Sequence, residues 1–206
     1  TGMESGEAAI ARLRDPEAKV SSHYVVEEDG RIFTLVAEER RAWHAGVSFW
    51  KGERDINGRS IGIEIVNPGH EFGYRAFPPA QIEAVVALCR AILARWPIPP
   101  ARVLGHSDVA PLRKTDPGEL FPWAELAGAG IGLWPPALAP VEAGEAAVAA
   151  WLAAFGYGYL EEDLPAVLRA LQRHFRPARI DGRPDGETAA IARWLAESVD
   201  SAPREA

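Results

Sequence analysis

A proline-rich stretch separates two parts of this sequence that differ in hydrophobic pattern. Three prolines lie among alanines between Trp134 and Gly144, a composition typical of a stiff linker. Patterns of strands and helices alternate before this stretch, whereas three amphipathic helical patterns follow it. We therefore predict a domain over residues 1–134, a linker over residues 135–144 and a small all-α three-helix bundle over residues 145–200.

The first part contains patterns of both strands and helices. Residues 23–26 and 31–37 are strand-like runs on either side of a Glu-Asp-Gly turn, which predicts a β-hairpin. Residues 60–66 alternate, with isoleucines on one face and Glu64 on the other. Residues 79–96 place apolar side chains at helical spacing until Pro97 ends the pattern. This order predicts an α/β domain whose sheet is covered by helices.

A histidine and an aspartate ten residues apart are the candidates for metal binding. Residues 102–104 form a short apolar run, which predicts a strand with His106 near its carboxyl end, where α/β proteins commonly bind ligands. The proline and glycine after Asp116 predict a loop that folds back. Catalytic zinc sites use three ligands of these types and leave a position open for water. By spacing alone, a surface histidine and a turn aspartate remain the alternative.

Composition excludes several classes of function. The formal net charge is -7, with 22 Lys and Arg against 29 Asp and Glu, so the chain has no basic surface for nucleic acid. No apolar run approaches the roughly 20 residues that span a bilayer. A single cysteine, Cys89, excludes an internal disulfide and a thiolate-rich metal site. We expect neither nucleic-acid binding nor a transmembrane segment.

Five phrases of the first part belong together: residues 20–26, 42–46, 60–64, 105–108 and 114–118. Together they resemble one family, the zinc-dependent N-acetylmuramoyl-L-alanine amidases of the AmpD and AmiD type. The resemblance runs in order from Thr1 to about Trp134 and implies a mixed central β-sheet flanked by helices. Residues 171–175 and 181–188 are similar to small three-helix peptidoglycan-binding domains.

The resemblance implies a hydrolase that cuts the amide between the lactyl group of N-acetylmuramic acid and L-alanine of the stem peptide. It assigns His106 and Asp116 as zinc ligands and Glu64 as the base that deprotonates the attacking water. It assigns Lys114 as the donor that stabilises the oxyanion. Glu64 as an exposed strand carboxylate is the alternative from the residue pattern alone.

The family's first zinc ligand is a histidine on the opening strand, and the resemblance places it upstream of Thr1. We therefore expect the opening strand to be missing from residues 1–206, and this chain to hold zinc weakly and to hydrolyse slowly. The alternative function is a recognition module that binds peptidoglycan without cutting it. Glu64, Lys114 and Asp116 favour the enzyme, because a module that only binds has no need of a base and an oxyanion donor.

The resemblance also implies the substrate and its surroundings. Tyr24 and His44 are expected to line the substrate pocket, with packing as the alternative for His44. The expected partners are peptidoglycan or muropeptide fragments of a bacterial cell wall, in wall turnover or muropeptide recycling. A wall-binding bundle favours the cell envelope or periplasm, with the cytoplasm as the alternative.

Overall fold

The structure is a computed structural model that describes residues 2–3 and 5–200, and these residues form two compact units. Segments 49–54 and 99–115 group in space with the C-terminal helices. A linker over residues 135–144 stays a prediction. The first unit comprises the residues up to 48, 55–98 and 116–122, and the second unit comprises 49–54, 99–115 and the residues from 123 onward.

A three-stranded mixed sheet forms the centre of the first unit, as predicted. Strands β1 (Tyr24–Val26) and β2 (Ile32–Thr34) pair antiparallel, and β1 pairs parallel with β3 (Ile63–Ile65), in the order β2-β1-β3. The hairpin turns at Gly30, whose φ of 86° is readily accessible to glycine and whose N–H donates to the Glu27 carbonyl at 2.9 Å.

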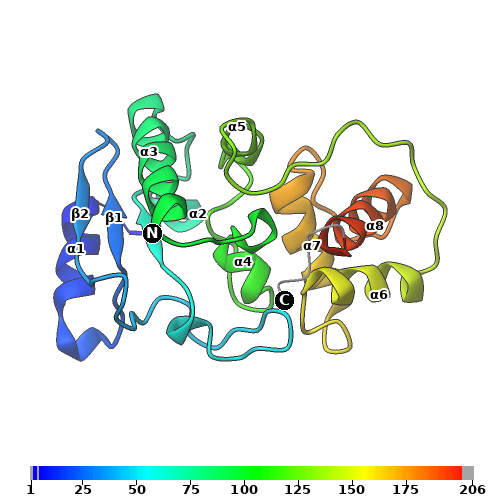
Figure 1. Cartoon of the computed structure of the whole chain (residues 1–206), viewed down its shortest axis with the longest axis horizontal. Helices are drawn as coiled ribbons and strands as arrows, with labels where there is room; N and C mark the ends of the chain where they lie inside the picture. Colours follow the sequence, from blue (N-terminus) through cyan, green and yellow to red (C-terminus); the bar gives the residue numbers. More distant parts are fainter. Residues whose placement is uncertain (1, 4, 201–206) are drawn as a thin grey trace. The chain divides into compact units, whose positions relative to one another are not determined.

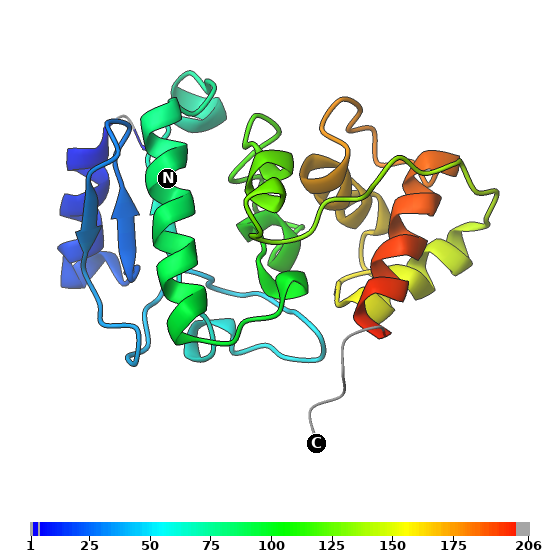
Figure 2. The same cartoon turned by 45° about the horizontal axis from the view of Figure 1, so that its top comes forward.

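Two helices of the first unit lie on opposite sides of the strands, as Figures 1 and 2 show. Helix α1 (Gly6–Arg14) begins at Ser5, whose Oγ accepts from the Ala8 N–H at 3.1 Å. Helix α3 (Pro79–Arg95) confirms the long predicted helix, and a third helix, α2, spans Gly69–Phe72. Short 3₁₀ turns occupy Pro16–Ala18 and Ile56–Gly58. The buried side of α3 consists of Gln81, Ile82, Val85, Leu88 and Ile92.

Gln81 joins α3 to the ends of the parallel strands. Its side chain is 0% exposed, and Nε2 donates to the carbonyls of Val26 at 3.0 Å and Val66 at 2.8 Å. The Val26 carbonyl also accepts from the Val66 N–H at 2.9 Å, so the glutamine adds a second donor to it and bonds the neighbouring chain at Val66. The glutamine therefore completes the sheet at its end.

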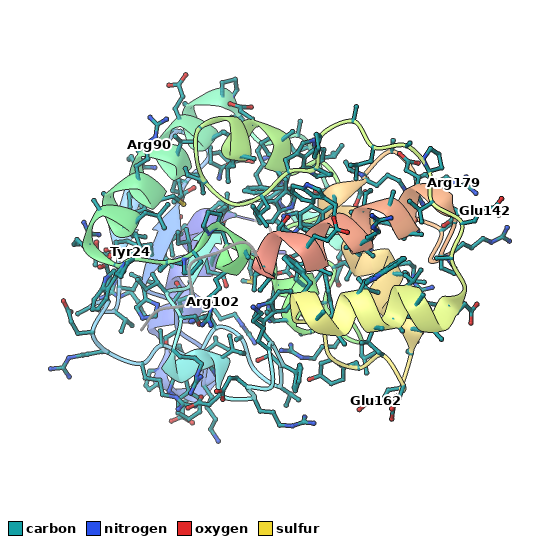
Figure 3. All side chains as sticks on the ribbon, turned by 45° about the vertical axis from the view of Figure 1, so that its right-hand side comes forward. Tyr24, Arg90, Arg102, Glu142, Glu162 and Arg179 are labelled. Carbon is teal, nitrogen blue, oxygen red and sulfur yellow. The ribbon has the colours of Figure 1, made fainter. Side chains whose placement is uncertain are left out.

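The second unit contains the three helices that the apolar patterns predict. They are α6 (Glu145–Phe155), α7 (Leu164–Phe175) and α8 (Gly186–Asp200), and α6 packs against α8. Glu142, Glu162 and Arg179, labelled in Figure 3, project from the segments that flank these helices. The buried core residues of the helices are Val148, Leu152, Phe155, Val167, Leu168, Leu171, Phe175, Ile191 and Leu195.

Gln172 on α7 fixes the loop that leads into α8. Its Oε1 accepts from the N–H groups of Asp181 at 2.9 Å and Gly182 at 2.8 Å. Its Nε2 donates to Asp181 Oδ1 at 3.1 Å, the Arg183 carbonyl at 3.1 Å and Thr188 Oγ1 at 3.2 Å. One buried amide therefore satisfies both the donors and the acceptors of the loop.

The predicted strand over residues 102–104 is wrong. A 3₁₀ turn spans Pro100–Arg102, and the Val103 N–H donates back to the Pro100 carbonyl at 3.2 Å. Proline fixes φ near the helical value at the start of such a turn. Two consecutive prolines before the apolar pair therefore determine the local structure more strongly than its hydrophobicity.

Among the described residues, no helix is long and apolar enough to cross a membrane.

Candidate active site

The residues that the sequence predicts for the active site are divided between the two units. The first unit contains Tyr24, His44, Glu64 and Asp116, and the second contains His106 and Lys114.

His106 is the first residue of α4 (His106–Val109), a single helical turn, and not the end of a strand as predicted. The Asp108 carboxylate caps the turn, because its Oδ2 accepts from the Gly105 N–H at 2.7 Å. The His106 ring is half-buried, and its Nε2 lies 3.4 Å from Nη2 of Arg113 in the loop that follows. The site residue is thus carried by a turn whose backbone is held by a neighbouring carboxylate.

Asp108 is the centre of a buried polar cluster that sequence reasoning missed. Its side chain is 1% exposed and also accepts from Tyr157 Oη at 2.7 Å and from His174 Nδ1 at 2.7 Å. Because a carboxylate only accepts, the hydrogen-bonded Nδ1 of His174 carries a proton. Burial, followed by the charge of Asp108, raises the pKa of Tyr157 well above its ordinary value. The carboxylate is therefore satisfied by three donors.

Stacked aromatic rings hold the His174 ring in place. The Trp123 ring centroid lies 3.8 Å from that of His174 at an interplanar angle of 20°, and the Phe175 centroid lies 3.8 Å away at 2°. The sequence predicts His174 to be a surface or structural residue, and the structure confirms a structural one. Its partner Asp108 is 66 residues away in the chain, so no local pattern shows the contact.

Lys114 lies in the loop after α4. The N–H groups of Arg113 and Lys114 both donate to the Ala110 carbonyl, at 3.1 Å and 3.0 Å. These bonds fold the chain tightly after α4 and keep the half-buried Lys114 in the same unit as His106. The loop is therefore bonded to the end of the turn that carries the histidine.

Asp116 opens a loop of the first unit that Tyr74 holds. Tyr74 Oη donates to the Pro117 carbonyl at 2.9 Å and accepts from the Leu120 N–H at 2.9 Å. Gly118 has φ of 93°, and a Cβ at this position would collide with the tyrosine hydroxyl. The folded-back loop predicted around Asp116 is present, with its carboxylate half-buried. The peptide bond between Asp116 and Pro117 is cis.

Glu64 lies in the middle of β3, in register with Val25 of the central strand. Near this strand, the ring of His44 packs so closely on Gly62 that a Cβ there would overlap it. Asn57 Oδ1 accepts from the His44 N–H at 3.0 Å and the Ala45 N–H at 2.7 Å, which fixes the loop that carries the histidine. Glu64 and His44 are both half-buried.

His23 has a structural role in the same unit. It is 0% exposed, its Nδ1 accepts from the Gly62 N–H at 2.9 Å, and its Nε2 lies 2.9 Å from the Arg40 carbonyl. Since Nδ1 accepts and a carbonyl cannot donate, Nε2 carries the proton of a neutral ring. Its ring meets that of His44 edge to face at a centroid distance of 5.5 Å. His23 therefore supports the position of His44.

Tyr24, predicted to line the substrate pocket, has an internal partner for its hydroxyl. Tyr24 Oη donates to Glu38 Oε1 at 2.7 Å, and this carboxylate also accepts from Arg95 Nη2 at 2.6 Å and Trp96 Nε1 at 2.7 Å. These donors, Arg95 first, lower the pKa of Glu38 to about 2. Burial and the neighbouring Glu38 raise the pKa of Tyr24. Substrate contact by Tyr24 stays a prediction.

The described residues do not make up a complete zinc site. Among residues 2–3 and 5–200, no three His, Cys, Asp or Glu side chains form a group that could hold a metal ion. Catalytic zinc takes three protein ligands, and the predicted donors in this chain are two, His106 and Asp116.

The chain matches known amidases in sequence. The family model described as N-acetylmuramoyl-L-alanine amidase matches residues 1–119, a range that includes all six predicted site residues. N-acetylmuramoyl-L-alanine amidase AmiD of Escherichia coli K12 is 40% identical over 93% of this chain and 78% of its own length. The 1,6-anhydro-N-acetylmuramyl-L-alanine amidase AmpD of Citrobacter freundii is 40% identical over 58% of this chain and 59% of its own length.

Solved structures agree over almost the whole chain. A complex of E. coli AmiD with the substrate anhydro-N-acetylmuramic acid-L-Ala-D-γ-Glu-L-Lys has a TM-score of 0.86 at 40% identity, covering 94% of this chain and 85% of AmiD. AmpDh3 of Pseudomonas aeruginosa has a TM-score of 0.85 at 36% identity, covering 98% of this chain and 90% of AmpDh3. The match to AmiD thus extends well beyond residue 119, and the fold, the site segments and the family model agree. The chain belongs to the N-acetylmuramoyl-L-alanine amidase family.

Proposed function

We propose that the chain hydrolyses the amide between the lactyl group of N-acetylmuramic acid and L-alanine of a peptidoglycan stem peptide. The similarity to AmiD carries this proposal, because it spans 94% of the chain and AmiD was solved with such a substrate. We place the reaction in cell-wall turnover or muropeptide recycling. An anhydro-muropeptide is the substrate form we favour, since AmiD binds one.

Glu64 and Lys114 are the chain's own reactive side chains in this proposal. Glu64 accepts the proton of the attacking water, a role that a positioned carboxylate can perform at neutral pH. Lys114 donates to the oxyanion that forms as the carbonyl becomes tetrahedral. The close packing of His44 on Gly62 and the fixed loop at Asn57 support a rigid wall for the sugar or the peptide beside β3. We propose Tyr24 and His44 as residues of that wall.

We propose zinc as the cofactor, held by His106, Asp116 and a histidine outside residues 1–206. Lewis acidity toward a carbonyl oxygen is the chemistry that such an ion supplies. The metal content per mole of protein, measured with and without an added upstream strand carrying that histidine, tests the ligand set. Equal, stoichiometric zinc in both proteins would contradict it.

The alternative is a recognition module that binds peptidoglycan without cutting it. The observation behind it is that His106 and Asp116 supply two of the three protein ligands that a catalytic zinc ion takes. We propose that α6, α7 and α8 form a peptidoglycan-binding domain, and a domain of this kind favours the cell envelope over the cytoplasm.

Chromatography of the products separates the two functions. The chain with the added upstream strand that carries the histidine is incubated with anhydro-N-acetylmuramic acid-L-Ala-D-γ-Glu-L-Lys in the presence of zinc, and the tripeptide is quantified. Release of L-Ala-D-γ-Glu-L-Lys that Glu64→Gln abolishes supports the amidase. Saturable binding of the substrate without release supports the recognition module.

A further inference from the structure

A cavity of about 310 Å³ lies within the second unit, between the loop at residues 111–115 and helix α7. Its size is at the lower end of the range of roughly 300–1,000 Å³ for small-molecule sites. All of its lining residues belong to one compact unit. The loop that carries Lys114 and helix α7 therefore face each other across the cavity.

Four cationic side chains line this cavity against one carboxylate. Arg113 and Lys114 come from the loop, and Arg169 and Arg173 come from α7. Asp163 is the one acidic residue among the nine described residues of the lining, and its Oδ1 accepts from the Ala166 N–H at 2.8 Å as the cap of α7. The lining side chains thus carry a net positive charge, although the whole chain has a formal net charge of -7.

The two arginines of α7 that line the cavity lie side by side on the helix. Arg169 and Arg173 are four residues apart on α7 and so lie on the same face of the helix, where like charges repel. Arg173 Nη1 donates to the Arg169 carbonyl at 3.5 Å, which holds its guanidinium along the preceding turn of α7. Arg169 packs against Gly182, whose added Cβ would approach Arg169 Nη1 to 3.0 Å. Both guanidinium groups are therefore kept near the cavity by contacts within the unit.

The cavity adjoins the predicted reactive residues of its unit. Arg113 lines the cavity, and its Nη2 lies 3.4 Å from Nε2 of His106. Two residues of extended peptide reach about 7 Å. A group two residues beyond the cleaved amide can therefore lie in the cavity while that amide lies next to His106.

We propose that this cavity binds the free α-carboxylate of the γ-linked glutamate in the stem peptide. The inference rests on the proposed function, which supplies the substrate class. In L-Ala-D-γ-Glu-L-Lys the glutamate is joined through its side-chain carboxyl, so its α-carboxylate is free and lies one residue after L-alanine. Guanidinium groups bind carboxylates through paired, charge-assisted hydrogen bonds. Helix α7 is then a specificity-determining wall of the substrate site, with Arg169 and Arg173 as its anion-binding residues.

Binding of two synthetic peptides to the full chain tests this inference without requiring hydrolysis. The probes are L-Ala-D-γ-Glu-L-Lys and the same peptide with an α-carboxamide on the glutamate, measured by calorimetry. The lysine carboxylate is common to both, so the comparison isolates the glutamate group. We expect the free acid to bind about tenfold or more tightly than the amide, as one charge-assisted contact of roughly 1.4 kcal/mol predicts.

Variants assign this preference to the cavity. Arg169→Gln and Arg173→Gln should each reduce the preference for the acid severalfold. The matched control Arg193→Gln removes an arginine on α8 that pairs with Glu197 at 2.8 Å, and it should keep the full preference. Equal affinity for acid and amide, a preference unchanged in both cavity variants, or no binding of the free acid at millimolar concentration would each overturn the inference.

The outcomes separate this inference from the proposed function. A chain that prefers the acid through Arg169 but releases no tripeptide from the substrate keeps the anion site and loses the amidase activity. A chain that hydrolyses acid and amide substrates at equal kcat/KM, with both cavity variants unaffected, keeps the activity and loses the anion site. Circular dichroism of each variant confirms that differences in binding do not come from unfolding.

Discussion

Nδ1 of His174, on α7, lies 2.7 Å from Oδ2 of Asp108, on the turn that begins with His106. The same carboxylate accepts from Tyr157 at 2.7 Å, so two residues of the C-terminal helical segment hold the turn. Both hydrogen-bonded side chains are almost completely buried, at 2% exposed for His174 and 1% for Asp108. The C-terminal helices therefore stabilise the segment that carries a predicted site residue.

Removing one hydroxyl from this cluster should destabilise the chain measurably. Tyr157→Phe deletes one of three donors to the buried Asp108 carboxylate. We expect the free energy of unfolding to fall by about 1–3 kcal/mol, the usual cost of leaving a buried charged acceptor short of a donor. Urea unfolding at pH 7, followed by circular dichroism, measures the change.

A second tyrosine of the same segment provides the matched control. Tyr159 Oη is buried with no hydrogen-bond partner among the described residues. Tyr159→Phe should therefore leave the free energy of unfolding unchanged or raise it. Equal losses in the two variants would show that the hydroxyl at residue 157 has no special role.

Replacing Glu64 should abolish most of the proposed activity without changing the fold. Glu64→Gln keeps the size of the side chain and removes the base, so kcat should fall by roughly 10²–10⁴-fold. Glu83→Gln on the exposed face of α3 is the control and should keep the rate. The measurement is tripeptide release by chromatography, with thermal unfolding of both variants. A Glu64→Gln protein as active as wild type would exclude Glu64 as the base.

The sequence predicts those parts of the fold that depend on local periodicity. The hairpin around Gly30, the long helix α3 and the three C-terminal helices follow the expected patterns, because a strand or helix that buries one face repeats at a fixed interval. The mixed sheet is predicted by the family resemblance alone, because the alternation within one strand does not show whether its neighbours run parallel or antiparallel. On α3 the pattern placed Trp96 on the buried face, yet it lies just past the helix and is 37% exposed.

Long-range polar contacts could not be predicted. Asp108 meets Tyr157 and His174 across 49 and 66 residues, and Gln81 reaches Val26 across 55. Such contacts depend on tertiary packing, and a single buried polar residue leaves no periodic signal. The nearest sequence signal for Asp108 is its place in the Gly-His-Ser-Asp phrase, in which the histidine is the residue that the resemblance assigns a role.

Acid should weaken the first unit through Glu38. Its pKa is lowered from an ordinary 4.5 to about 2, so its carboxylate binds fewer protons in the folded than in the unfolded state. The contribution is complete above about pH 4.5 and is lost as the pH falls toward 2. Arg95 is half exposed, so solvent screening reduces the contribution to about 1–2 kcal/mol.

Glu38→Gln isolates this effect. The variant has no carboxylate to titrate, so the difference in free energy of unfolding between wild type and variant should shrink by about 1–2 kcal/mol between pH 6 and pH 2.5. Urea unfolding at several pH values gives the difference directly. A constant difference across this range would show that the contacts of Glu38 with Arg95 and Trp96 do not depend on its charge.

Cys89 should react slowly in the folded chain. Burial raises the pKa of its thiol to about 11, and the thiolate is the reactive form. At pH 8 the thiolate fraction is roughly one in a thousand, about a hundredfold below that of an unperturbed thiol. Alkylation by iodoacetamide, followed by mass spectrometry, should be slow in buffer and fast in urea. Equal rates in the two solvents would contradict the burial of the thiol.

Gln172→Glu tests the loop at residues 181–188. The substitution replaces the side-chain NH₂ group, which donates hydrogen bonds, with an oxygen that only accepts them. The amide Nε2 donates toward Asp181 Oδ1 and the Arg183 carbonyl, both of which only accept. A carboxylate oxygen there has no proton to donate, and its charge repels that of Asp181 in a buried place. We expect a loss of about 3 kcal/mol or more in the free energy of unfolding. Glu161→Gln, on the exposed turn before α7, should change it by less than about 0.5 kcal/mol. If Gln172→Glu is as stable as wild type in urea, the loop at residues 181–188 does not depend on this amide.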